Sequence, residues 1–410
     1  MENLREQRGL ILAATKSIRK IGGRWVVPSQ TGQGMYSVFI KPTEHSCTCP
    51  DYETRRQDCK HVYAALYVMR REENSDGSTT VTETAIAVET TQRTTYPQAW
   101  SAYNAAQTSE KDKFQSLLFD LCKGVEGTEP KKTGRPRLPL SDAIFSAAFK
   151  VYSTVSARRF MTDLREAQAK SFIAKTPHFN SISNCLENSE VTPILRNLIT
   201  QSTLPLRAVE TDFAVDSSGF ITSRFARWFD AKYGKQQVKH DWVKVHIACG
   251  VRTNIVTAVE IGERYTSDRA FFVPMIEATA KNFRIAEVSA DKGYDGKTNT
   301  EAVMNMGAMP FIAFKSNATG SAGGAYQRMF HYFMYNREEF LKHYHKRSNV
   351  ESTFSMMKRK FGESVRSKTD TAMVNEVLCK ILCHNLVVLI HEMHELGIDP
   401  MFARTDGAIM

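Results

Sequence analysis

The segment from Tyr344 to Lys358 constrains the fold most, because both its polar and its apolar residues recur at helical spacing. At about 100° per residue, four polar residues fall within roughly 60° of arc on one helix: Tyr344, Arg347, Glu351 and Lys358. The apolar residues form the bordering face: Val350, Phe354, Met357 and Phe361. We therefore expect one helix whose apolar face packs on a core and whose polar face holds a carboxylate beside two cations and a phenol.

That polar face suits work on phosphate. A carboxylate can hold a metal ion while neighbouring cations bind a phosphate backbone. The alternative is an ordinary surface helix in which Arg347 and Glu351 form an ion pair four residues apart.

A second motif lies near the N-terminus and combines three thiols with an imidazole: Cys47, Cys49, Cys59 and His61. Four such donors complete a tetrahedral zinc site with no open position, which favours a structural metal over a catalytic one. The motif resembles the SWIM zinc finger, C-x-C-x(n)-C-x-H, in all four ligands. That resemblance implies binding to DNA or to protein and leaves both open.

Composition favours a polyanionic partner inside a reducing compartment. The 410 residues include 54 Lys and Arg against 44 Asp and Glu, a formal net charge of +10, and the isoelectric point is near 9.1. The 8 cysteines are too few and too clustered for a secreted disulfide scaffold. The apolar run 377–390 is too short to span a bilayer, so we expect a buried helix, no membrane association and a cytoplasmic, nucleoid-associated location.

The chain divides by pattern into five parts. We expect a zinc-finger domain over 1–71, a Thr-rich flexible linker over 72–95, a helical DNA-binding region over 96–205, an α/β core over 206–396 and a tail over 397–410. Within the helical region, Ser141 to Ile173 is expected to be one long amphipathic stretch capped by Ser141 or Asp142.

Before that stretch, Arg135 and Arg137 flank Pro136 in a short basic segment that is similar to the core of an AT-hook. Such a segment can enter a narrow A·T minor groove. A solvated basic turn is the alternative.

From Ala208 onward the pattern changes to strands. Apolar residues alternate with polar ones up to Asp216, which is expected to project from the opposite face to the apolar row near the strand's end. Two further strands form a meander, and a later strand at 285–290 delivers Asp291 at its carboxyl end. The expected order is βββαβαβα, a mixed five-stranded sheet flanked by helices in which Asp216, Asp291 and Glu351 meet. Three carboxylates at one point suggest two-metal phosphoryl transfer.

These residues, together with the spacing Tyr344-x(2)-Arg347-x(3)-Glu351-x(6)-Lys358, resemble the DDE transposases of bacterial insertion sequences with the Y-R-E-K signature. The resemblance covers about residues 130 to 395. It implies an RNase H-like core and dependence on Mg²⁺, with Mn²⁺ as an alternative. It also implies cleavage of double-stranded DNA at transposon terminal repeats, joining of the 3′-hydroxyl to target DNA, and a homodimer that pairs two ends.

The same resemblance implies the residue roles. Asp216, Asp291 and Glu351 would bind the metal; Tyr344, Arg347 and Lys358 would contact the DNA backbone at the cleaved end. The 60 residues from Asp291 to Glu351 are too few for the strand-rich insertion of some members, which leaves open whether a hairpin intermediate is used. Two alternatives are a transposase-derived, non-catalytic, zinc-containing DNA-binding protein and a structure-specific nuclease on the same fold.

Overall fold

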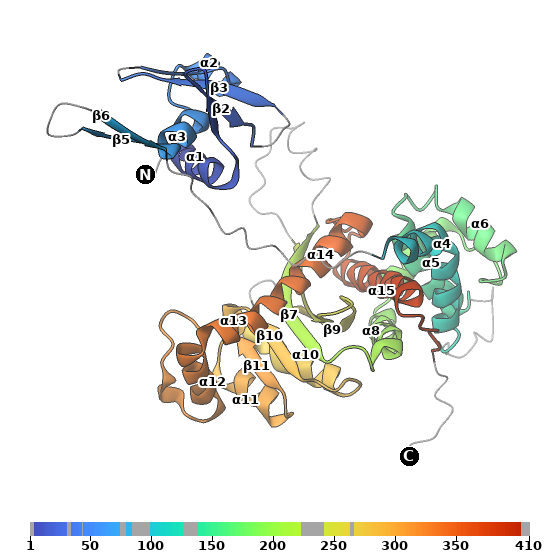
Figure 1. The fold of residues 1–410 in the computed structure, drawn as a ribbon. Helices are drawn as coiled ribbons and strands as arrows, with labels where there is room; N and C mark the ends of the chain where they lie inside the picture. The colour runs from blue at the N-terminus through green and yellow to red at the C-terminus, as the bar shows by residue number, and fades with distance from the viewer. Residues whose placement is uncertain are drawn as a thin grey trace, which may run out of the picture. The chain divides into compact units, whose positions relative to one another are not determined.

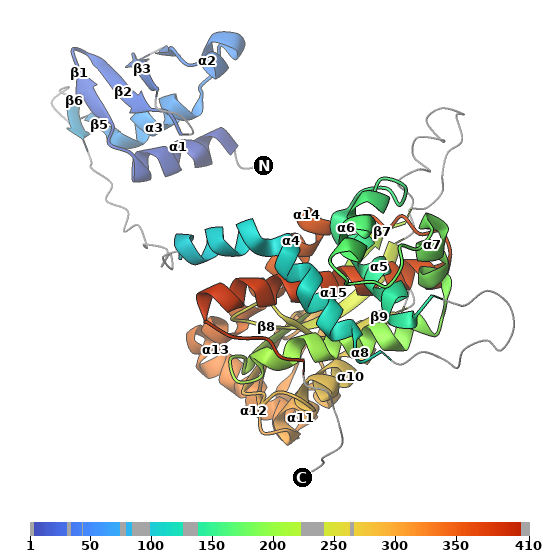
Figure 2. The same ribbon diagram turned by 90° about the vertical axis from the view of Figure 1, so that its right-hand side faces the viewer.

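The computed structural model describes residues 4–30, 34–42, 44–73, 79–83, 99–125, 138–222, 242–262 and 266–402. They form two compact units, Met1–Pro97 and Gln98–Met410, shown in Figures 1 and 2. The basic segment with Arg135 and Arg137 lies outside the described residues.

The first unit is a four-stranded antiparallel sheet packed on helices. Its strands, in the order β1-β2-β3-β4, pair as consecutive neighbours: β1 (Arg19–Ile21), β2 (Arg24–Pro28), β3 (Met35–Ile40) and β4 (His45–Cys47). Trp25 and Val27 alternate with more exposed positions along β2 and enter the core. The helices are α1 (Leu4–Thr15), α2 (Pro50–Arg55) and α3 (Lys60–Val68).

The expected linker over 72–95 contains ordered backbone. Strands β5 (Met69–Glu73) and β6 (Thr79–Glu83) pair antiparallel with each other. Thr has a high strand propensity, so a Thr-rich stretch can pair as readily as it can link.

The second unit begins with five helices: α4 (Trp100–Cys122), α5 (Leu140–Ser153), α6 (Met161–Ala169), α7 (Phe179–Glu187) and α8 (Val191–Thr203). The helical region expected from Ser141 to Ile173 is divided into α5 and α6, because α5 ends at Ser153 and its C-cap residue, Thr154, is left-handed with a φ of 58°. The expected cap is wrong, since Pro139 occupies the N-cap position. The Asp142 carboxylate instead accepts the N–H of Ala174 at 2.9 Å and secures the segment after α6.

The sheet that follows confirms the expected mixed architecture. Its order is β11-β10-β7-β8-β9, with β7, β8 and β9 antiparallel and β10 and β11 parallel to β7. The strands are β7 (Asp212–Ile221), β8 (Trp242–Gly250), β9 (Val256–Gly262), β10 (Glu287–Ala290) and β11 (Met309–Ile312).

Helices cover both faces of the sheet, as the alternation along β7 requires. Phe213 and Val215 pack with α10 (Arg269–Ala280) and α11 (Lys297–Asn305). Ala214, on the opposite face, joins a larger core with α4, α5, α7, α8, α14 and α15 (Asp370–Glu395). Helix α15 is long and apolar enough to cross a membrane, but 89% of its most apolar window is buried in the protein. Its hydrophobicity is accounted for by core packing, and the expected buried helix is confirmed.

The expected single helix from Tyr344 to Lys358 is wrong. Helix α12 (Gly324–Tyr335) is followed by α13 (Arg337–Tyr344), then by the 3₁₀ turn η4 (His345–Arg347) and by α14 (Ser348–Phe361). The apolar face expected on α14 is buried: Val350, Phe354, Met357 and Phe361.

Candidate active site and metal centre

Strand pairing brings Asp216 and Asp291 together. β7 and β10 run parallel with Val215 opposite Ala290, so these two acids are the next residues along neighbouring strands. Asp216 lies in the middle of β7 rather than near its end, because β7 continues to Ile221 against β8. Asp291 directly follows β10 as expected, and its Oδ1 accepts the N–H of Gly293 at 2.8 Å.

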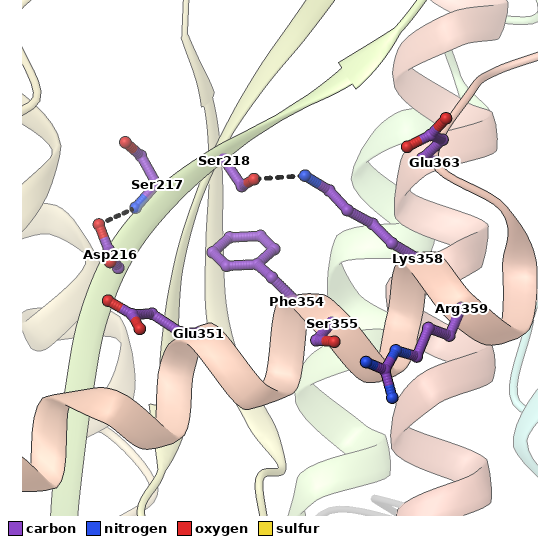
Figure 3. A pocket seen from close by; sticks show the side chains of 9 residues that line it. All are labelled: Asp216, Ser217, Ser218, Glu351, Phe354, Ser355, Lys358, Arg359 and Glu363. Carbon is purple, nitrogen blue, oxygen red and sulfur yellow. Dashed lines mark hydrogen bonds between the residues drawn. The ribbon is translucent and has the colours of Figure 1, made fainter. Parts of the chain in front are cut away.

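Helix α14 supplies the third acid, and an arginine joins it to the sheet. Arg347 donates to the Asp216 carboxylate at 2.9 Å and to the Glu351 carboxylate at 2.6 Å. Figure 3 shows Asp216 on the strand and Glu351 on the neighbouring helix, facing the same pocket. Arg347 therefore lies between two of the three predicted metal ligands.

The two other predicted metal ligands affect the charge of Asp216. Burial raises the pKa of its carboxyl, and the negative charges of Asp291 and Glu351 raise it further. The N–H of Ser217, at 2.8 Å, and the charge of Arg347 oppose that rise. Such a cluster of carboxylates in one field is the setting in which a divalent cation is stabilised.

The pocket lined by Asp216 and Glu351 has a volume of about 470 Å³ and extends along α14. Lys358 lines it and donates to the Ser218 hydroxyl at 2.6 Å. Burial lowers the pKa of Lys358, and Glu363 opposes that shift. Tyr344 ends α13, with its ring centroid 6.0 Å from Arg347 Cζ. Both cations of the predicted set thus lie beside the acids.

Sequence reasoning missed Lys346, which fixes the turn before α14 against the sheet. Its ammonium donates to Asp212 at 2.7 Å and to Glu287 at 2.8 Å. These two acids are register partners on β7 and β10, each four residues before a predicted metal ligand. The repeated spacing of four residues could have pointed to Asp212 and Glu287 in the sequence, because residues four apart on a strand share a face.

The four predicted zinc donors of the N-terminal unit are buried and gathered within 4.8 Å of one another. Cys49 Sγ lies 3.4 Å from Cys59 Sγ, which lies 3.8 Å from His61 Nδ1. Cys49 and Cys59 are the N-cap residues of α2 and α3, where helix dipoles favour thiolates.

The chemistry of this centre fits zinc. A hydrogen bond from Cys47 lowers the pKa of Cys59, which favours the thiolate form of Cys59. Among the described residues, buried His61 Nε2 has no hydrogen-bond partner. Three sulfurs and one imidazole at these separations match a closed tetrahedral site.

Comparison with known proteins agrees with this geometry. Residues 207–386 match the family model described as the transposase DDE domain, and residues 36–69 match that of the SWIM zinc finger. Residues 207–386 are thus similar to a transposase DDE domain, and residues 36–69, which precede them, are similar to a SWIM zinc finger.

Two other comparisons are less informative. No curated protein matches the chain significantly. Among solved structures, the cryo-EM structure of a piggyBac transposase synaptic complex with hairpin DNA aligns with 70% of this chain and 77% of that one. The identity is 10% and the TM-score is 0.36, a distant likeness.

Proposed function

We propose that this chain is the DNA transposase of an insertion sequence, which cleaves transposon ends and joins the freed 3′-hydroxyl to target DNA. The proposal is supported by the placement of Asp216 beside Asp291 on β7 and β10 and by the Arg347 link from Asp216 to Glu351, inside the region that matches a transposase DDE domain. Oxygen donors of this kind suit Mg²⁺, with Mn²⁺ as an alternative.

In this mechanism the chain's residues bind and orient, and two bound Mg²⁺ ions supply charge stabilisation at the attacking and leaving oxygens. Asp216, Asp291 and Glu351 would hold the metal, and two of them, Asp216 and Glu351, line the pocket. Lys358 is held by Ser218 beside that site, where an ammonium can bind a DNA phosphate. Arg347 and Tyr344 would contact the backbone at the cleaved end.

We assign the remaining parts by the same logic. The SWIM finger, with zinc on Cys47, Cys49, Cys59 and His61, would recognise the transposon end or support assembly. The helices over 96–205 and the basic Arg135 and Arg137 would bind double-stranded DNA. A homodimer would pair the two transposon ends. It would act on DNA in the cytoplasm and bind no membrane.

The test is incubation of the protein with end-labelled terminal-repeat DNA, target DNA and Mg²⁺, resolved on a denaturing gel. Strand joining is expected, and Asp291→Asn should abolish it while DNA binding remains. Nicking without joining would indicate a nuclease, and DNA binding with neither reaction would indicate a non-catalytic DNA-binding protein. A hairpin would be visible on the same gel as a slowly migrating, covalently closed end.

A further inference from the structure

A second cavity, of about 1180 Å³, lies on the helical side of the second unit. Its walls come from α5, the turn after α5, α7 and the segment between α14 and α15. Figure 2 shows α5 and α7 beside α15. The charged residues that line it are four cations and two acids: Lys150, Arg159, Arg366, Lys368, Glu187 and Glu376. We call this cavity the basic groove.

Lys150 is the unusual member of the basic groove. Its side chain is only 9% exposed, yet it makes no hydrogen bond or ion pair within the part of the chain that the structure describes. Burial lowers the pKa of Lys150, and the negative charge of Glu376 offsets part of that shift. Lys150 lines the cavity, so an anion that enters it can bind an ammonium that no protein group among the described residues already occupies.

Glu376, whose negative charge acts on Lys150, already accepts hydrogen bonds from other groups. The Glu376 carboxylate accepts the N–H groups of Arg366 and Ser367, at 2.9 and 2.8 Å, and the Ser367 hydroxyl at 2.7 Å. These bonds hold the segment between α14 and α15 against α15. Lys380 of α15 binds the same segment, because its ammonium donates to the carbonyls of Gly362 and Ser364 at 2.7 and 2.9 Å.

This segment therefore presents its cations in a fixed position. Arg366 also donates to the carbonyl of Val155 at 3.0 Å, which joins the two walls of the basic groove. Exposed Lys368 and Arg159 stand at its rim. Preorganised cations of this kind lose little entropy when they bind an anion.

The segment after α14 borders both cavities. Glu363 lines the pocket at Asp216, and the next residue, Ser364, lines the basic groove. The connection is rigid, because Ile221 of β7 donates its N–H to the carbonyl of Glu363 at 3.0 Å and accepts that of Val365 at 2.9 Å. A DNA strand that leaves the acids along α14 would pass Lys358 and meet this shared segment, whose other side lines the basic groove.

We propose that the basic groove binds the phosphodiester backbone of DNA next to the cleavage site, with Lys150 as the buried contact to one phosphate. This inference rests on the proposed function, since it concerns the path of the same DNA. The groove takes phosphates rather than bases, so its contribution is independent of sequence.

The test is the salt dependence of binding to a fluorescein-labelled, random-sequence duplex without Mg²⁺, measured by fluorescence anisotropy. Loss of one phosphate contact lowers the slope of log K against log salt by about 0.9. Lys150→Met is expected to show that drop. Lys281→Met, which removes one exposed charge at the end of α10, is the control and is expected to keep the wild-type slope.

Two further measurements keep the test decisive. Lys150→Met replaces a buried charge by an apolar chain of similar length, so its melting temperature should not fall. Should it unfold, Lys368→Gln, at an exposed position, carries the test with the same expected drop. An unchanged slope in a folded variant overturns the inference.

The remaining outcomes separate this inference from others. If Lys150→Met keeps the wild-type salt slope while the wild type joins strands, the groove assignment alone is overturned. A wild type that neither binds nor joins DNA overturns the proposed function together with it. Inorganic phosphate at constant ionic strength is the second probe. If phosphate stabilises the wild type but not Lys150→Met, while the two proteins share one DNA slope, the groove holds a small anion and the DNA assignment is wrong.

Discussion

The Arg347 guanidinium lies 2.9 Å from the Asp216 carboxylate and joins the turn before α14 to the central strand of the sheet. It also contacts Glu351 at 2.6 Å, so in the protein without metal it supplies the positive charge between two acids. A divalent cation bound there would take over that charge.

Arg347→Met should therefore destabilise the protein most when Mg²⁺ is absent. Asp216 is only 18% exposed, so removal of its partner is expected to cost about 1–3 kcal/mol. Mg²⁺ should restore part of the loss, and thermal melts with and without Mg²⁺ measure it. Arg328→Met, at an exposed site on α12, is the control, and an equal Mg²⁺ response in both variants would contradict the prediction.

Gly293→Ala should impair catalysis while leaving the fold intact. A Cβ at this position would lie 2.9 Å from Asp291 Oδ1, and the nearest group that can move is the carboxylate itself. A displaced ligand is expected to lower the rate of strand cleavage by roughly 10- to 100-fold. Gly124→Ala, whose Cβ would meet nothing within 4 Å, should cleave at the wild-type rate. A wild-type rate for Gly293→Ala would show that Asp291 does not act from this position.

Cys59→Ser should release zinc and unfold the first unit. Folding and metal binding are coupled in closed sites of this kind, where the metal contributes roughly 10–16 kcal/mol. Zinc content by atomic absorption should fall from one ion per chain to none, with loss of the cooperative melt of residues 1–97. Cys185→Ser, a buried thiol of the second unit, is the matched control and should retain zinc. Retention of zinc by Cys59→Ser would refute the assigned ligand set.

Stability at neutral pH should rise in Glu392→Gln. Burial raises the pKa of Glu392 to about 7, with Glu395 and Glu210 adding to the shift and Arg252 opposing it. A raised folded-state pKa gives stability that is full below the unfolded value, near 4.5, and is lost as pH rises through 7.

The wild type should thus lose up to about 3 kcal/mol relative to Glu392→Gln between pH 4.5 and pH 8. Urea unfolding of both proteins across that range gives the difference in their free energies of unfolding. Burial lowers the pKa of His384 to about 4, and this opposite effect is the same in both proteins, so it cancels in the difference. A flat difference curve would mean that Glu392 is ionised without penalty.

Local patterns predicted the parts of this protein that depend on local chemistry. The four zinc donors form a sequence motif, and alternation along β7 correctly placed Phe213 and Asp216 on opposite faces. The order of strands and helices in the core followed from periodicity as far as β11, whereas α12 and α13 come before α14 where a single helix was expected.

Features set by contacts distant in sequence were less accessible. Helical spacing alone predicts one helix through Tyr344 and Lys358, whereas Lys346 is bound by Asp212 and Glu287, more than fifty residues away. The chain forms a 3₁₀ turn there instead. Asp216 lies in mid-strand for a similar reason, since β8 pairs with β7 as far as Ile221, which periodicity within β7 does not reveal.

The large hydrophobic core shared by α4, α5, α7, α8, the sheet and α15 has a practical consequence for fragment work. A truncated protein beginning at residue 206 would expose the sides of α15 and the sheet that α8 and α5 normally cover, and such apolar surfaces promote aggregation. Soluble expression of the catalytic part should therefore require the helices from Trp100 onward, while the zinc finger can be removed near Pro97.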